Sequence, residues 1–128
     1  MRGLVVDTSV WIDYFAGDEI PGLEAALAGG IVVLAPLVAA ELVSGAARAR
    51  DRRALAELIA ELVVHEAPLA HWLRVGELRR ELQDKGLAVS VPDAHVVQCA
   101  LDRDAPLLAR DAVFSSIATL TPFELYQV

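Results

Sequence analysis

The sequence predicts an α/β fold in which helices cover both faces of a central, mostly parallel sheet. Two observations lead to this class. Short apolar runs rich in Val, Ile and Leu alternate with stretches whose apolar residues recur at helical spacing. In addition, 55% of the 128 residues are hydrophobic, enough to bury such a sheet without disulfides or a structural metal. At this length we expect a single domain, residues 1–128, with no linker.

Four short runs have the composition of buried strands. They are uncharged, and helical stretches separate the first three, as expected when crossover helices join parallel strands. The predicted strands are residues 3–6, 31–34, 106–109 and 117–120.

Helical patterns fill most of the remaining chain. The predicted helices are residues 9–17, 20–30, 37–45, 51–64, 69–82 and 90–102. In the fourth, apolar residues recur at i, i+3, i+4, i+7 and i+8, namely at Leu55, Leu58, Ile59, Leu62 and Val63. Gly17 and Gly86 are expected to end two of the helices, and Ser90 is the expected N-cap of the last.

Composition also limits where the protein works and what it binds. The strongly apolar run at residues 31–40 contains a proline and is well below the roughly 20 residues that cross a bilayer. An acid at position 7 interrupts any secretory signal, so we expect a cytoplasmic protein with no membrane contact. Cys99 has no second cysteine to pair with and is expected in the core. A net charge of −7 disfavours nucleic acid on average, although a local distribution of charge can override the total.

Four acidic residues are not explained by solvent-facing helix surfaces. Asp7 follows the first predicted strand, and Asp111 follows the strand at 106–109. Asp93 lies in the first turn of its helix, whereas Glu41 interrupts the apolar stretch "PLVAAELV". Each also has an ordinary structural interpretation. Asp7 could cap a helix, Asp93 could form a capping box with its N-cap serine, Asp111 could be a turn residue, and Glu41 could face solvent.

Taken together, these four carboxylates predict a metal site. In a doubly wound sheet, strand ends and the following helix starts converge, so the acids would repel one another unless a cation shared the site. Mg²⁺ or Mn²⁺ suits such oxygen ligands, and a pair of these ions activates water for the in-line attack used by nucleases and phosphatases. The expected metal ligands are Asp7, Glu41, Asp93 and Asp111, supported by a hydroxyl of Thr8 or Ser9.

Four stretches in this order carry a family resemblance over nearly the whole chain: "VVDTSVWIDYF", "ELVSG", "VPDAHVVQCAL" and "APLLARDAVFSSI". The sequence resembles PIN-domain ribonucleases, specifically the VapC-type toxins of VapBC toxin–antitoxin pairs. The resemblance implies a three-layer α/β/α sandwich, Mg²⁺- or Mn²⁺-dependent cleavage of RNA, inhibition by a cognate antitoxin protein, and a homodimer. Carried over by position, the catalytic residues are the same four acids together with Ser9.

Two other classes stay open beside this one. A receiver-like Mg²⁺-binding signalling domain is also small, acidic and doubly wound, but it needs a lysine after a late strand, and the only lysine is Lys85 in a predicted helix. A non-enzymatic α/β interaction domain with a decayed site predicts a missing acid, and none is missing. A phosphatase with D-x-D after its first strand is disfavoured because Ser9 stands where the second acid should be.

The remaining polar residues have less specific interpretations. The segment "RARDRR", residues 48–53, either steers RNA phosphates toward the acidic site or forms a solvated helix start. His65, His71 and His95 are expected at the surface, because none has zinc-type spacing with Cys99.

Overall fold

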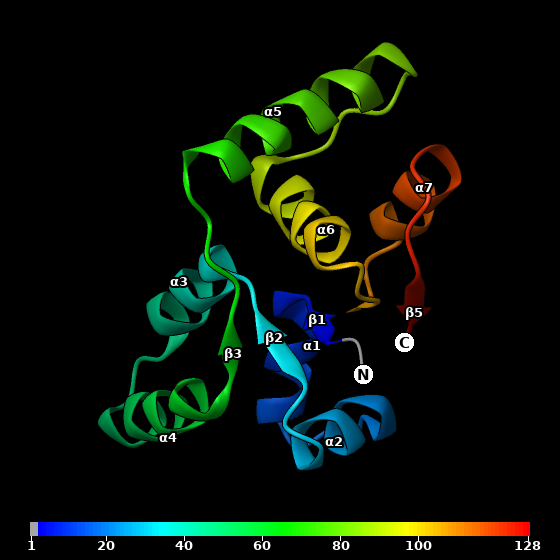
Figure 1. Cartoon of the computed structure of the whole chain (residues 1–128). Helices are drawn as coiled ribbons and strands as arrows, with labels where there is room; N and C mark the ends of the chain where they lie inside the picture. Colours follow the sequence, from blue (N-terminus) through cyan, green and yellow to red (C-terminus); the bar gives the residue numbers. More distant parts are fainter. Residues whose placement is uncertain (1–2) are drawn as a thin grey trace.

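The computed structural model describes residues 3–128, which form five strands and seven helices (Figure 1). The strands are β1 (Leu4–Val6), β2 (Val32–Leu34), β3 (Val63–Val64), β4 (Leu107–Ala109) and β5 (Leu125–Gln127). The helices are α1 (Thr8–Phe15), α2 (Pro21–Ala28), α3 (Pro36–Gly45), α4 (Ala49–Glu61), α5 (Leu69–Asp84), α6 (Val91–Arg103) and α7 (Val113–Leu120). The predicted α/β class is confirmed.

All five strands pair in parallel, in the order β3-β2-β1-β4-β5. From β1 the chain moves outward to β2 and β3, then crosses back to β4 and continues to β5. The direction of winding therefore reverses between β1 and β4, which lie side by side at the centre. Open parallel sheets bind ligands just beyond the carboxyl ends of the strands at such a switch point.

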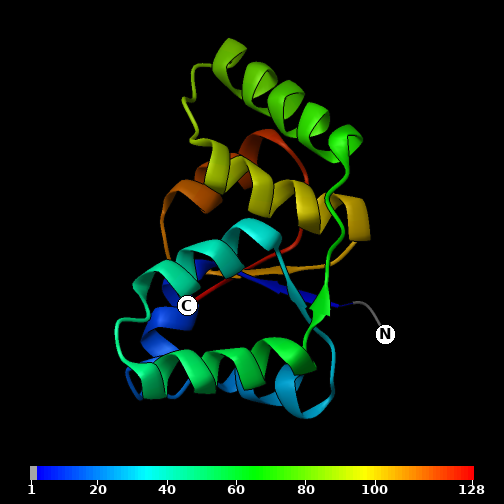
Figure 2. The same ribbon diagram turned by 90° about the vertical axis from the view of Figure 1, so that its left-hand side faces the viewer.

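Helices form a layer on each face of the sheet. In Figure 2, α5, α6 and α7 lie on one side of the strands, while α1, α2 and α4 lie on the other. Helix α3 contacts both α1 and α6, so it joins the two layers at one end of the sheet. This arrangement is the predicted α/β/α sandwich.

The core follows from the double coverage of the sheet. Every residue of β1, β2 and β4 is buried, which explains why these strands are continuous apolar runs instead of alternating ones. Trp11 of α1 and Phe114 of α7 are the largest fully buried side chains. Cys99 is also buried, as predicted. Within residues 3–128, no helix is both long enough and apolar enough to cross a membrane.

The prediction of a strand at 117–120 is wrong. These residues complete α7, whose Phe114 and Ile117 are three positions apart and both point into the core. The last strand is β5, which lies beyond the predicted run and exposes most of its length. The predicted helix at 51–64 also ends early, because Val63 and Val64 pair with Val33 and Leu34 as the edge strand β3.

Candidate active site

Two of the four singled-out acids flank the switch point of the sheet. Asp7 directly follows β1, and its backbone N–H donates to the carbonyl oxygen of Leu108 in β4 at 3.0 Å. Asp111 follows β4 after one intervening residue. Because β1 and β4 are paired neighbours, both acids leave the sheet at the same edge.

The other two acids reach this edge from helices. Asp93 lies in the first turn of α6, which packs against β1, and its N–H donates to the Ser90 hydroxyl at 3.2 Å. Glu41 lies in α3, where its Oε1 accepts a hydrogen bond of 2.9 Å from the hydroxyl of Thr8. That bond ties α3 to the first residue of α1, immediately after Asp7.

Burial and mutual repulsion act on the two most enclosed carboxyls. Burial raises the pKa of Asp7 above its ordinary value; the hydroxyl of Ser9 opposes this and the charge of Asp93 adds to it. Burial also raises the pKa of Asp93, and the charges of Asp111 and Glu41 raise it further. The structure therefore brings all four acids into one electrostatically coupled group.

The ordinary structural interpretations of these acids hold only in part. Asp7 occupies the N-cap position of α1 but makes no side-chain capping hydrogen bond; its Oδ2 instead accepts from the Ser9 hydroxyl at 3.0 Å. Ser90 caps α6 as predicted. Asp111 does form a turn, since its Oδ1 accepts from the N–H of Val113 at 3.0 Å. A carboxylate offers about four acceptor sites, so a local bond of this kind does not prevent it from binding a ligand.

The cations among the described residues leave this group uncompensated. Arg110, next to Asp111 in sequence, forms ion pairs with Asp13 and Asp18. Within the described part of the chain, no Lys, Arg or His nitrogen forms an ion pair with any of the four acids. A set of oxygen donors with excess negative charge is the chemistry that Mg²⁺ and Mn²⁺ prefer, so these residues fit such an ion.

An apolar groove adjoins the acids. We call it the α1–α3–α4 groove; it has a volume of about 550 Å³ and is lined by Ile12, Phe15, Ala16, Glu41, Leu42, Gly45, Ala46, Asp51, Ala54 and Leu55. Two of its large apolar side chains are strongly exposed, Ile12 at 56% and Phe15 at 47%. Glu41 belongs both to the groove and to the acidic group, which makes the two sites continuous.

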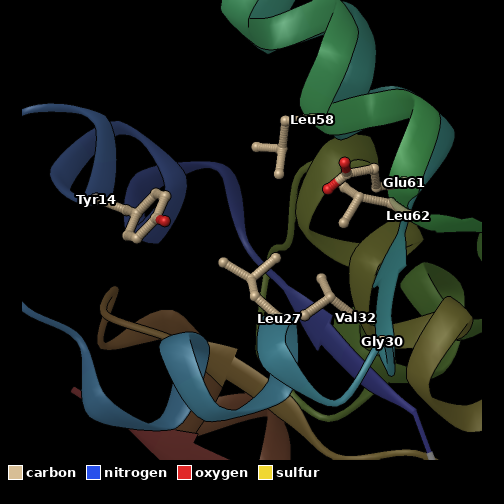
Figure 3. Close-up of a pocket in the computed structure, with 7 residues that line it drawn as sticks. All are labelled: Tyr14, Leu27, Gly30, Val32, Leu58, Glu61 and Leu62. Atoms are coloured by element: carbon tan, nitrogen blue, oxygen red, sulfur yellow. The ribbon is translucent and has the colours of Figure 1, made fainter.

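A smaller hollow of about 200 Å³ lies elsewhere on the molecule. Figure 3 shows its lining, which comes from α1, α2, β2 and α4 and combines apolar side chains with the Tyr14 hydroxyl and the Glu61 carboxylate. It reaches Gly30 and Val32, at the amino end of β2. The acids follow the carboxyl ends of the strands, so this hollow is not part of their site.

The prediction that the three histidines lie at the surface is wrong. His71 and His95 are fully buried, and His65 is 7% exposed. The absence of zinc-type spacing carried that prediction, but it says nothing about burial. The sequence did contain a signal of burial, because residues 94–100 carry no charge and include His95. In the structure every residue of this stretch of α6 is buried.

Comparison with known proteins agrees with this architecture. The PIN domain family model matches residues 4–120. A doubly wound sheet with acids at its switch point is the class of structure described above; more specifically, the chain belongs to the PIN domain family. No curated protein sequence matches the chain significantly.

Solved structures with the same fold come from toxin–antitoxin complexes. A DNA-bound VapBC from Salmonella typhimurium matches with a TM-score of 0.78 at 17% identity, over 99% of this chain and 98% of that one. VapBC-1 from nontypeable Haemophilus influenzae gives 0.76 at 19% identity, over 97% and 96%. VapBC-5 from Mycobacterium tuberculosis gives 0.67 at 24% identity, over the full length of both chains. At these identities the likeness shows a shared fold.

The raised pKa of Asp7 predicts a measurable effect on stability in metal-free buffer. The folded protein holds the Asp7 proton more tightly than the unfolded chain does. The stability that this tighter proton binding contributes is complete below pH 3.8 and is lost as the pH rises through the raised pKa of the folded state. Asp7→Asn removes that loss. The variant should therefore be more stable than wild type at pH 7, with an advantage that shrinks toward pH 4, as measured by urea unfolding.

Glu57→Gln is the matched control, because Glu57 is exposed on α4 and should show no such pH-dependent difference. An Asp7→Asn variant that is less stable than wild type at pH 7 and more stable at pH 4 would contradict the electrostatic account.

Proposed function

We propose that this chain is a Mg²⁺- or Mn²⁺-dependent endoribonuclease, the VapC-type toxin of a toxin–antitoxin pair. The observation that carries the proposal is the group of four carboxylates at the switch point, with no cation of the described chain to compensate it. Membership of the PIN domain family supports the same reading. We assign Asp7, Glu41, Asp93 and Asp111 as metal ligands, with Ser9 in support.

The surrounding residues hold these carboxylates in place. The Ser9 hydroxyl donates to Asp7 and the Thr8 hydroxyl donates to Glu41, so two adjacent residues of α1 orient two of the acids. A divalent cation bound here would supply an activated water for attack on a phosphodiester and would stabilise the leaving oxygen. The amino-terminal ends of α1 and α6 also meet the site, and their partial positive charge favours a bound phosphate.

The arginine-rich segment at residues 48–53 gives a route for RNA binding. It forms the exposed start of α4, which is compatible with both interpretations of the segment. One of its members, Arg52, also donates to the carbonyl oxygens of Ala46 and Ala47 just after α3. We propose that the exposed guanidinium groups in this segment attract RNA phosphates toward the acids.

Replacing a single carboxylate should reduce RNA cleavage without unfolding the protein. Asp93→Asn keeps the shape of the side chain but removes a ligand charge. Cleavage of a mixed RNA pool in Mn²⁺ should fall by on the order of 100-fold or more, since even outer partners of metal ligands are worth about 10- to 100-fold. The thermal unfolding of the variant in chelator should show that the fold is retained.

Glu57→Gln serves as the control and should cleave at the wild-type rate. Equal losses in the two variants would sink the site assignment. Cleavage that persists undiminished in excess EDTA would defeat metal dependence, and cleavage of DNA in place of RNA would redirect the substrate class.

We further propose that a cognate antitoxin docks in the α1–α3–α4 groove. An amphipathic helix can place apolar side chains against Ile12 and Phe15. Both residues are large, apolar and strongly exposed, as is typical of a surface that a partner covers. Glu41 and Asp51 add negative charge to the groove, so the partner segment should carry Arg or Lys. An arginine of the partner that lies beside Glu41 would take the place of the metal ion's charge and inhibit the enzyme.

A charge placed in the groove should abolish this interaction. Phe15→Asp adds a carboxylate to the apolar surface, and co-expression with the neighbouring small open reading frame should then yield no complex on affinity purification. Leu73→Asp puts the same charge at an exposed leucine of α5 and should retain the complex. If both variants retain it, or both lose it, the groove is not the docking site.

We also propose that the protein works in the cytoplasm and that it forms a homodimer; the family resemblance implies the dimer. Around residues 37–43 and 55–63, Val38, Leu42 and Leu55 belong to the chain's own core, while Val43 is exposed. Any dimer contact in this region would therefore centre on Val43 and its neighbours.

A further inference from the structure

The three buried histidines form a polar cluster between α5 and α6 that the acidic site does not include. His71 packs edge-on against His65 and His95, with ring centroids 5.2 and 4.8 Å apart. Trp72 stacks on His95 with centroids 4.5 Å apart and planes 9° from parallel. Buried polar rings need hydrogen-bond partners, so the cluster requires an account of each ring nitrogen.

A continuous hydrogen-bond chain links this cluster to α3. The backbone N–H of Leu37 donates to Nε2 of His95 at 3.4 Å, and Nδ1 of His95 lies 2.7 Å from Nε2 of His71. Nδ1 of His71 lies 2.9 Å from Oδ2 of Asp102. The chain thus runs from Asp102 through two imidazoles to the backbone of Leu37.

The groups at the two ends of the hydrogen-bond chain determine which ring nitrogens carry a proton. A backbone N–H can only donate, so Nε2 of His95 is an acceptor and its Nδ1 carries the proton. That proton points to Nε2 of His71, which leaves the Nδ1 proton of His71 for Asp102. Although burial acts to raise it, the pKa of Asp102 is held well below its usual range by hydrogen bonds from Arg74, His71 and Gln98, so this carboxylate is an acceptor.

His95 supplies a cap that α3 cannot supply itself. The N-cap position of α3 is Ala35, which has no side-chain acceptor for the unpaired N–H groups at the helix start. Leu37 is the second residue of α3, and His95 from α6 accepts its N–H. Glu41 lies one turn further along α3, and Asp93 lies two residues before His95 on α6. The cap therefore joins the two helices that carry these acids.

The Asp102 end of the hydrogen-bond chain is firmly anchored. Asp102 accepts from Nε and a terminal nitrogen of Arg74 at 3.1 and 2.9 Å, and from Gln98 at 2.9 Å. A carboxylate bound in this way holds His71 in one tautomer and one orientation, as the carboxylate does for a metal-binding or catalytic histidine.

A metal ion is the competing interpretation of the cluster. Donor atoms of His65, His71 and Cys99 lie within 4.8 Å of one another, and Nε2 of His65 has no hydrogen-bond partner. However, both nitrogens of His71 are already used at 2.7 and 2.9 Å, and burial raises the pKa of the Cys99 thiol to about 12. Zinc binds the thiolate and not the thiol, so the observations favour the hydrogen-bond chain.

We propose that His95 is a positioning residue for the acidic site: held by Asp102 and His71, it caps α3 and so fixes Glu41 relative to Asp93. The consequence for cleavage rests on the proposed nuclease function, whereas the hydrogen-bond chain itself does not.

The tautomers give a direct test on the wild-type protein. Long-range ¹H–¹⁵N correlation spectra of the metal-free protein at neutral pH should show both His71 and His95 protonated at Nδ1. Protonation of His95 at Nε2 would overturn the proposal, because that nitrogen could not then accept from Leu37. Stoichiometric zinc in the protein as purified, bound through His65, His71 and Cys99, would also overturn it.

Two substitutions at His95 separate positioning from simple packing. In His95→Gln the amide oxygen can reach the position of Nε2 and keep the cap on Leu37. In His95→Asn the shorter amide reaches only the position of Nδ1, so it keeps the bond to His71 and loses the cap. We expect His95→Asn to weaken Mn²⁺ binding by on the order of 10-fold or more and to lower kcat, with His95→Gln much closer to wild type.

Equal Mn²⁺ affinity and kcat in the two folded variants would reduce His95 to a packing residue and overturn the positioning role. If either variant fails to fold, the wild-type tautomers decide. A wild-type chain that shows the Nδ1 tautomers but neither binds Mn²⁺ nor cleaves RNA would defeat the proposed function and leave the hydrogen-bond chain intact.

Discussion

Four carboxylates meet beyond the carboxyl ends of the two central strands, and the electrostatic repulsion among them governs how the surrounding residues are arranged. Parallel strands β1 and β4 release Asp7 and Asp111 at one edge, while α6 and α3 bring Asp93 and Glu41 to it. Like charges this close destabilise the fold unless they are held and then neutralised. Hydrogen bonds with the Thr8, Ser9 and Ser90 hydroxyls hold Glu41, Asp7 and Asp93 in place. Neutralising the carboxylates is left to an external cation, either a metal ion or a basic side chain of a partner.

Much of the fold could be predicted from the sequence because buried parallel strands are short continuous apolar runs. The same property made residues 117–120 misleading, since four uncharged residues, three of them apolar, do not distinguish a strand from one helical turn. The helical period becomes visible only when Phe114 is included with Ile117. Strand β5 had no comparable signal, because only Leu125 is partly buried and the rest of the strand faces solvent.

The acidic site was predictable for a different reason. A carboxylate directly after a buried strand is conspicuous in sequence, and the topology of a doubly wound sheet then places such residues together. The histidine cluster could not be found in this way. Its hydrogen bonds join α5 to α6 and α6 to α3, over 24 and 58 residues of sequence, so no local spacing reveals them. Only the uncharged stretch containing His95 indicated burial.

If the four acids bind a divalent cation, adding Mn²⁺ should stabilise the folded protein. A ligand that binds only the folded state at about 100 times its dissociation constant stabilises that state by about 2.7 kcal/mol. Equilibrium unfolding of wild type should shift by this amount in Mn²⁺ and return in EDTA, while the Asp7→Asn, Asp93→Asn double variant should barely respond. A wild-type unfolding curve that is unchanged by both Mn²⁺ and Mg²⁺ would contradict the account.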